Sequence, residues 1–222
     1  MLSCENVGKI YATQRGCVAA IEGIDLDVPE GRFVAIVGRS GSGKSSLMAM
    51  MGGLSRPTHG AVRIQGTNIW ELPAHRLAEF RNRKIGFVFQ FASLFSTMRI
   101  IDNVALPALL DRRRDLEGAY ARADELLCRL GLAEYTDAYP HEISAGEQRL
   151  AAIARALINA PALLLADEPT SDLDAQTEIE IMSQFRNLNR NCGVTLVIVT
   201  HSLTLAEQAD RIFHIANGRM VA

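Results

Sequence analysis

One run of the sequence has residue types and spacing suited to holding phosphate groups. It follows the pattern G-x-x-x-x-G-K-[ST] and consists of Gly38, Arg39, Ser40, Gly41, Ser42, Gly43, Lys44 and Ser45, with Ser46 next in the predicted site. The apolar run 33–37 precedes it, so a buried strand leads into a glycine-rich turn whose backbone N–H groups surround an anion. In such a loop Lys44 reaches the β- and γ-phosphates and Ser45 binds Mg²⁺, while the next helix turns its N-terminus toward the phosphates. The run predicts a site for a nucleoside triphosphate rather than an empty β-to-α turn.

A second candidate site lies where the apolar run 163–166 ends in two acids, Asp167 and Glu168. Open α/β sheets bind ligands at the carboxyl ends of their strands. There Asp167 can bind Mg²⁺ through water, and Glu168 can orient or deprotonate the attacking water. The alternative is that both acids only cap the following loop; the phosphate loop upstream favours the catalytic interpretation.

A third motif, Ser144-Ala145-Gly146-Glu147, opens a predicted helix. Ser144 and Glu147 have the S-x-x-E spacing of a capping box, which is a purely structural device. The same helix N-terminus is also suited to binding an anion. The two interpretations are compatible, and the choice depends on what faces that end of the helix.

The composition is that of an ordinary globular protein. The chain has 222 residues, 48% hydrophobic and 22% charged, with a formal net charge of -2, so its charge gives no reason to expect a nucleic-acid partner. Its four cysteines lack metal-ligand or redox spacing, which indicates reduced thiols in a cytosolic protein. We expect no signal peptide, because Cys4, Glu5 and Asn6 interrupt any apolar run near the start. The apolar stretches are strand-length, whereas a membrane span needs roughly 20 residues, so a role at a membrane requires a separate partner.

Hydrophobic patterning predicts an α/β fold. The predicted strands are 1–7, 18–28, 32–37, 61–64, 85–89, 163–166, 194–199 and 211–216, and the predicted helices are 46–51, 73–83, 120–130, 145–159, 175–191 and 203–209. Near-continuous apolar strands that alternate with helices indicate a mostly parallel sheet covered on both faces. A mostly helical insert, 91–159, interrupts this core. Within it, the basic run 112–114 is predicted to be a solvated loop.

Taken together, these motifs resemble the ATP-binding subunits of ABC transporters. The phosphate loop, Gln90, the segment 144–148, the pair Asp167-Glu168, the segment 171–174 and His201 follow that family's order and spacing over essentially the whole chain. The resemblance implies one P-loop (RecA-like) domain with an N-terminal antiparallel β subdomain. The nucleotide-binding core would comprise 1–90 and 160–222, and the helical subdomain 91–159.

The resemblance also implies roles for single residues. Ser144, Ala145, Gly146 and Glu147 would form the signature segment, which contacts the γ-phosphate held by a second subunit. Two ATP molecules would be enclosed in a head-to-tail dimer of this chain with itself or a homologue. Gln90 would sense Mg²⁺ and the membrane partner, His201 would contact the γ-phosphate, and Tyr11 would stack on adenine, an interaction worth about 1–3 kcal/mol per base in nucleic-acid systems.

Three positions depart from the family pattern. Ala145 replaces a common glycine, Leu150 replaces a usually polar residue, and Asp172 adds an acid to the loop that crosses the dimer interface.

The segments 86–90 and 101–107 are similar to those of lipoprotein-releasing and macrolide-exporter ATPases. The chain is therefore expected to be a cytoplasmic ATPase, peripheral on the inner face of the cell membrane, that binds a transmembrane permease subunit. The alternatives are a soluble relative that remodels nucleic acid or ribosomes and a nucleotide-gated subunit with little turnover. The cargo cannot be read from this chain.

Overall fold

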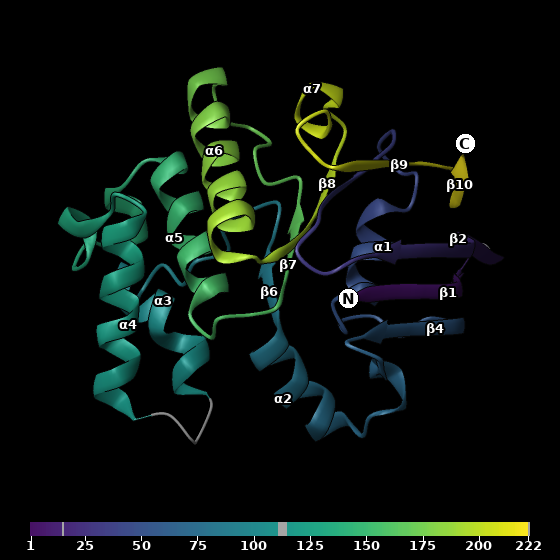
Figure 1. The fold of residues 1–222 in the computed structure, drawn as a ribbon, viewed down its shortest axis with the longest axis horizontal. Coiled ribbons are helices and arrows are strands. Elements are labelled where there is room, and N and C mark those ends of the chain that lie inside the picture. The colour runs from purple at the N-terminus through teal and green to yellow at the C-terminus, as the bar shows by residue number, and fades with distance from the viewer. Residues whose placement is uncertain (15, 111–114, 222) are drawn as a thin grey trace.

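A six-stranded sheet forms the centre of the molecule, with strand order β10-β9-β3-β8-β7-β6. The computed structural model describes residues 1–14, 16–110 and 115–221 (Figure 1); the basic run 112–114 lies outside them. The strands of this sheet are β3 (Phe33–Val37), β6 (Ile85–Val88), β7 (Leu163–Asp167), β8 (Thr195–Thr200), β9 (Arg211–Ala216) and β10 (Arg219–Val221). All neighbours pair in parallel except β9 and β10, which form an antiparallel hairpin. The predicted mostly parallel sheet is confirmed.

Side chains alternate between the two faces of this sheet and supply two hydrophobic cores. In β7, Leu164 and Ala166 belong to one core, and Leu163 and Leu165 to the other. This alternation follows from the period of two in a strand. Because both faces are covered, the strands consist of continuous apolar residues.

Helices cover one face of the sheet, and helix α1 together with a second sheet covers the other (Figure 1). The first core includes apolar residues of α3 (Ile100–Leu109), α4 (Leu116–Arg129), α5 (Ala145–Leu157) and α6 (Ala175–Cys192). The second core packs α1 (Lys44–Met51) against β1 (Leu2–Thr13), β2 (Gly16–Val28) and β4 (His59–Ile64). These strands form an antiparallel sheet of order β2-β1-β4-β5, in which β5 is Thr67–Asn68. The antiparallel N-terminal sheet implied by the resemblance is therefore present.

Most element boundaries agree with the sequence predictions, with a few differences. Helix α2 spans Ala74–Lys84 and α7 spans Leu203–Ala206. Helix α3 is absent from the predicted helices, and it contains Pro107 although proline usually breaks a helix interior. Strand β1 continues to Thr13, well past residue 7, because it pairs with β2 along a long hairpin. The short strands β5 and β10 carry too few residues for a hydrophobic pattern.

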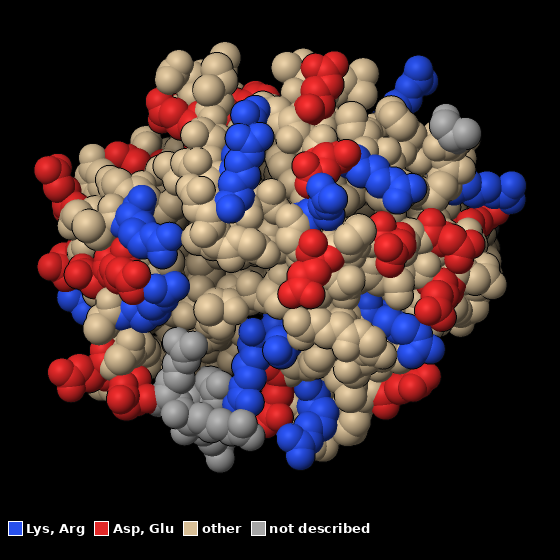
Figure 2. All heavy atoms as spheres, in the orientation of Figure 1, with Lys and Arg blue, Asp and Glu red and all other residues tan. Residues whose placement is uncertain are grey.

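The surface carries charges of both signs. Figure 2 shows Lys and Arg interspersed with Asp and Glu over the face seen in Figure 1. Within the described residues, no helix has the length and apolar character needed to cross a membrane.

Candidate active site

Parallel pairing of four adjacent strands brings four of the predicted residues to one edge of the sheet. In the order β3-β8-β7-β6, Val37 pairs with Thr200, Asp167 with Val199, and Val88 with Ala166. The chain leaves these strands at Gly38, His201, Glu168 and the segment that carries Gln90. Residues from four distant parts of the sequence therefore meet at the carboxyl edge, where open α/β sheets bind ligands.

The phosphate loop requires glycine where other backbone approaches it. Gly43 is the N-cap of α1 with a φ of 103°, and a Cβ there would lie 2.4 Å from the carbonyl oxygen of Ala20. A Cβ on Gly38 would lie 2.3 Å from the carbonyl oxygen of Ile215. The loop is thus held between β2 and β9, and it directs the N-terminus of α1 toward its own concave side.

Lys44 lies inside the loop with its amine among oxygen atoms. Its side chain is 7% exposed, and Nζ donates to the carbonyl oxygens of Gly38 at 2.8 Å and Arg39 at 3.2 Å. Nζ also lies 3.6 Å from Oε1 of Glu168. A buried ammonium group is costly unless negative charge or acceptors surround it. The loop carbonyls and Glu168 now fill the place that phosphate oxygens can take.

Glu168 connects Lys44 to His201. Its side chain is 13% exposed, and Oε2 lies 2.8 Å from Nδ1 of His201 and accepts a hydrogen bond from the His201 backbone N–H. A carboxylate can only accept, so Nδ1 is the donor nitrogen of the ring. Glu168 itself has a φ of 44°, and its N–H donates to the carbonyl oxygen of Val199. This left-handed conformation turns the chain sharply at the end of β7 and directs the carboxylate into the site.

Asp167 and Ser45 provide oxygen atoms of the kind that Mg²⁺ prefers. The Ser45 hydroxyl hydrogen-bonds the Asp167 side chain, while Oδ1 of Asp167 is buried with no partner among the described residues. Burial raises the pKa of Asp167 above its ordinary value. No group of three metal-binding side chains occurs in the described part of the chain. This donor set fits Mg²⁺, which is commonly held by one or two protein oxygens together with substrate phosphates.

A pocket of about 590 Å³ opens beside the loop. Its lining contains Ala20, Arg39, Ser40, Gly41, Gly43, Lys44, Ser45, Ser46, Gln90, Glu168 and His201. Tyr11 lies near it, with its hydroxyl 3.5 Å from Oγ of Ser46 and Nζ of Lys9 5.1 Å from the ring centroid. Sequence reasoning missed Ala20, because Ala20 meets the loop through its backbone and no side-chain signal marks it.

The capping box predicted for Ser144 and Glu147 is present. The Glu147 N–H donates to Oγ of Ser144 at 3.3 Å, and Oε2 of Glu147 accepts from the Ser144 N–H and hydroxyl at 2.7 Å each. These hydrogen bonds lower the pKa of Glu147. The Ser144 hydroxyl therefore already donates its hydrogen bond to Glu147. An anion that binds at this helix N-terminus must compete with Glu147 for that hydrogen bond.

The signature segment does not meet the phosphate loop of its own chain. None of Ser144, Ala145, Gly146 and Glu147 is among the described residues that line the pocket. Ser144 and Ala145 are exposed, and a Cβ on Gly146 would lie 2.6 Å from Cγ2 of Thr177 in α6. Among the described residues, the phosphate loop and the N-terminus of α5 are thus separate elements that one copy does not bring together.

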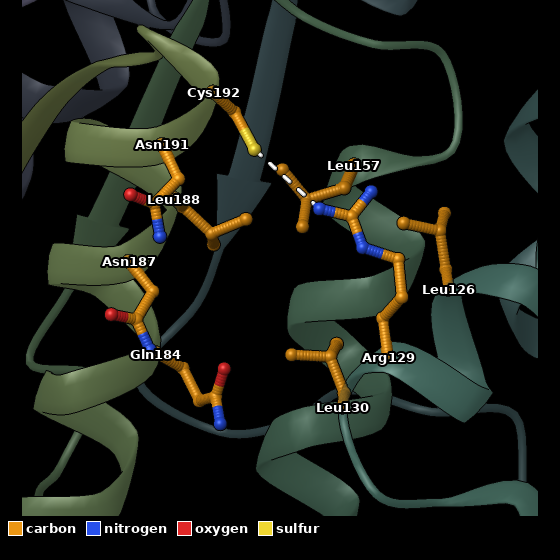
Figure 3. A pocket seen from close by; sticks show the side chains of 9 residues that line it. All are labelled: Leu126, Arg129, Leu130, Leu157, Gln184, Asn187, Leu188, Asn191 and Cys192. Carbon is orange, nitrogen blue, oxygen red and sulfur yellow. Dashed lines mark hydrogen bonds between the residues drawn. The ribbon is translucent and has the colours of Figure 1, made fainter.

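A smaller cavity lies among α4, α5 and α6, away from the predicted residues (Figure 3). Its volume is about 220 Å³, and its apolar lining is Leu126, Leu130, Leu157 and Leu188. At its rim Arg129 donates to Sγ of Cys192 at 3.5 Å. None of the predicted site residues is among its described lining residues, so it is distinct from the pocket beside the phosphate loop.

Known proteins resemble this chain over its full length. The family described as ABC transporter matches residues 21–171. The lipoprotein-releasing system ATP-binding protein LolD of Geobacter metallireducens is 44% identical over 100% of this chain and 98% of its own. The macrolide export ATP-binding/permease protein MacB of Syntrophobacter fumaroxidans is 42% identical over 98% of this chain, which spans 31% of that longer protein. The ATP-binding cassette MJ0796, solved as a dimer in a post-hydrolysis state with ADP and Pi, is 36% identical with a TM-score of 0.93, covering 100% of this chain and 97% of that one.

Proposed function

The chain belongs to the ABC transporter family as an ATP-binding and ATP-hydrolysing subunit, and we propose that it powers a transporter of the lipoprotein-releasing type. Support comes from the LolD proteins, which are 44% and 42% identical over nearly their whole lengths. The segments 86–90 and 101–107 favour the same subclass. Such an ATPase is peripheral on the inner face of the cell membrane, held there by a transmembrane permease subunit.

The observation that carries the ATP-driven pairing of two copies is the separation of the two proposed anion-binding elements. Each chain has a phosphate loop on one side and an exposed signature segment elsewhere. A head-to-tail pair completes both sites, because the Ser144–Glu147 helix end of one copy then faces the γ-phosphate on the other. Helix N-termini stabilise anions there through free N–H groups and the helix dipole.

The residues in and near the pocket have different roles in binding ATP. Tyr11 stacks on adenine, and residues 38–46 hold the phosphates with Lys44 on the β- and γ-groups. Ser45, Asp167 and Gln90 hold Mg²⁺, which neutralises charge on the phosphate oxygens. We propose that Lys44 leaves Glu168 for the phosphates when ATP binds, since both anions require the same ammonium group.

Hydrolysis then uses the released Glu168. Its carboxylate orients a water molecule for attack on the γ-phosphorus and accepts a proton from that water. The bond between the γ-phosphorus and the bridging oxygen breaks, and ADP leaves with the bridging oxygen. His201 holds Glu168 through Nδ1 and contacts the γ-phosphate. ATP binding closes the dimer and hydrolysis reopens it, and the helical subdomain 91–159 moves with these steps.

We assign the permease to a groove next to Gln90. This groove has a volume of about 810 Å³, and its lining includes Phe89, Phe95, Arg83, Leu110 and Arg155. Phe95 is 53% exposed and Leu110 71% exposed. Large apolar side chains left exposed in a group commonly mark a protein interface. A segment of the permease in this groove would contact both the sheet and the helical insert.

Membrane co-purification tests the partner. A tagged chain should capture an integral membrane protein, identified by mass spectrometry, and Phe95→Asp should abolish the capture without changing ATP affinity. Ile179→Asp is the matched control, since Ile179 is 61% exposed on α6 and outside the groove. Recovery of soluble proteins only, or capture that is unaffected by Phe95→Asp, would refute the assignment.

A further inference from the structure

Arg149 is a buried cation that sequence analysis did not predict to be functional. It lies on α5 shortly after the signature segment, and its side chain is only 5% exposed. The residues that follow it, Ala151 to Ala154, are buried and apolar. A charge in such surroundings is costly unless hydrogen bonds offset its desolvation. A buried arginine at this position therefore calls for a specific explanation.

One of its contacts reaches the backbone next to Gln90. Nη1 of Arg149 donates to the carbonyl oxygen of Phe89 at 2.7 Å. That carbonyl belongs to the planar peptide unit joining Phe89 to Gln90. The guanidinium therefore restrains the orientation of this peptide unit, and with it the position of the Gln90 backbone. Charge-assisted hydrogen bonds of this kind are about twice as strong as neutral ones.

A second arginine of the same helix holds the next part of this segment. Arg155 donates to the carbonyl oxygens of Ala92 at 2.8 Å and Ser93 at 2.7 Å. Residues 89–93 are thus attached to α5 at two points. Of the two arginines, Arg149 is closer in the sequence to the signature segment, and its hydrogen-bond partner Phe89 is the direct neighbour of Gln90.

The guanidinium retains unused hydrogen-bonding capacity. Its Nε is buried and has no partner in the described part of the chain. Burial lowers the pKa of Arg149, and the negative charge of Asp172 opposes this effect. Asp172 follows Glu168 on the loop after β7 and has a φ of 64°. After its bond to the Phe89 carbonyl, the buried guanidinium therefore still has a donor to offer.

We propose that Arg149 is a positioning residue of the ATPase reaction, which ties Gln90 to the signature helix through its hydrogen bond to the Phe89 carbonyl. A displacement of α5 when the signature segment meets ATP is then passed to Gln90 through the Phe89 carbonyl. This inference rests on the role proposed for Gln90 above. Arg149 itself need not touch the nucleotide.

A double-mutant cycle with Gln90 tests the inference. Arg149→Gln should lower kcat about tenfold and leave the KM for ATP within about twofold, since the phosphate loop is untouched. On a Gln90→Ala background the same change should have almost no further effect, because its target is already gone. Arg186→Gln is the control, because this arginine of α6 hydrogen-bonds Gln208 rather than residues 89–93, and its effect should be the same on both backgrounds.

A measurement without nucleotide separates positioning from activity. In Arg149→Gln, backbone amide exchange should accelerate at residues 89–93 and stay unchanged in β7. Arg149→Lys keeps the buried charge and a donor for the Phe89 carbonyl. This variant should therefore fold and have a kcat between those of Arg149→Gln and the parent. These variants keep the inference testable if the glutamine variant is unstable.

The outcomes distinguish the two levels of the proposal. If Gln90→Ala has parental activity, the role of Gln90 fails and this inference fails with it. If Gln90→Ala is impaired but Arg149→Gln lowers its kcat by a further tenfold or so, only the positioning role is refuted. Unchanged amide exchange at 89–93 would also refute it.

Discussion

Nδ1 of His201 lies 2.8 Å from Oε2 of Glu168, although the two residues are 33 positions apart in the sequence. They meet because β8 and β7 are neighbours and end at the same edge of the sheet. The other carboxylate oxygen of Glu168 lies 3.6 Å from Nζ of Lys44. The proposed base therefore has a basic side chain next to each of its carboxylate oxygens.

The Glu168→Gln variant should bind ATP but hydrolyse it very slowly. Loss of a general base typically costs about 10²–10⁴-fold in rate, and the amide keeps nearly the same shape. The variant should therefore accumulate as an ATP-bound dimer, measured by size-exclusion chromatography and phosphate release. Normal hydrolysis in this variant would exclude Glu168 as the base, and a monomer in Mg-ATP with the partner present would exclude the closed pair.

The Lys44→Ala variant should lose tight ATP binding. The ammonium group is the buried cation inside the loop, and charge-assisted hydrogen bonds contribute about 1.5–3 kcal/mol each. The expected loss of affinity is on the order of a hundredfold, measured with a fluorescent ATP analogue. Lys84→Ala is the control, since Lys84 is exposed at the end of α2. Equal affinities in the two variants would contradict the role of the loop.

Glu147→Gln should strengthen the ATP-bound dimer. The Glu147 carboxylate accepts a hydrogen bond from the Ser144 hydroxyl. It therefore places negative charge where a γ-phosphate is proposed to bind. Removing one half-buried like charge is worth about 0.2–1 kcal/mol. The dimer dissociation constant should therefore fall about threefold, measured by analytical ultracentrifugation in the Glu168→Gln background.

Ser144→Ala is the companion of that variant. It removes the N-cap of α5 and should cost about 1 kcal/mol of stability as well as weaken the dimer. A variant that loses stability but dimerises normally would reduce Ser144 to its capping role.

Asp102 should make the free energy of unfolding of the protein depend on pH. It accepts hydrogen bonds from Arg99 Nε at 2.9 Å and from the Tyr120 hydroxyl at 2.9 Å. The Arg99 hydrogen bond, aided by Tyr120, lowers the pKa of Asp102 below its ordinary value of 3.8. This contribution is therefore complete above pH 3.8 and is lost as pH falls through the lowered pKa.

Asp102→Asn should accordingly destabilise the protein by about 1 kcal/mol at pH 7. The difference from the parent should shrink below pH 3.8, followed by urea unfolding at several pH values. Asp137→Asn is the control, because Asp137 also pairs with Arg99 but is 82% exposed and should have almost no effect. A pH-independent difference for Asp102→Asn would contradict the assignment.

Short motifs were sufficient to predict the parts of the site that depend on neighbours in the sequence. The phosphate loop, the capping box and the acids after β7 are each made by contiguous residues, so their local geometry is encoded within a few positions. The strand interiors were readable for the same reason, because burial on both faces requires uninterrupted apolar residues. Helix α3 is not among the predicted helices; it accommodates Pro107 and is stabilised by packing against α4 and α5.

Only the tertiary structure determined which of these parts meet. Strand order places Gly38, His201, Glu168 and Gln90 along one edge, and strand order depends on burial and pairing between distant segments. The contact of Arg149 with Phe89 joins residues 60 positions apart, and no local pattern encodes it. The separation of the signature segment from the phosphate loop is likewise a property of the folded chain. The sequence by itself determined the chemical groups, and the packing of the sheet and helices decided their partners.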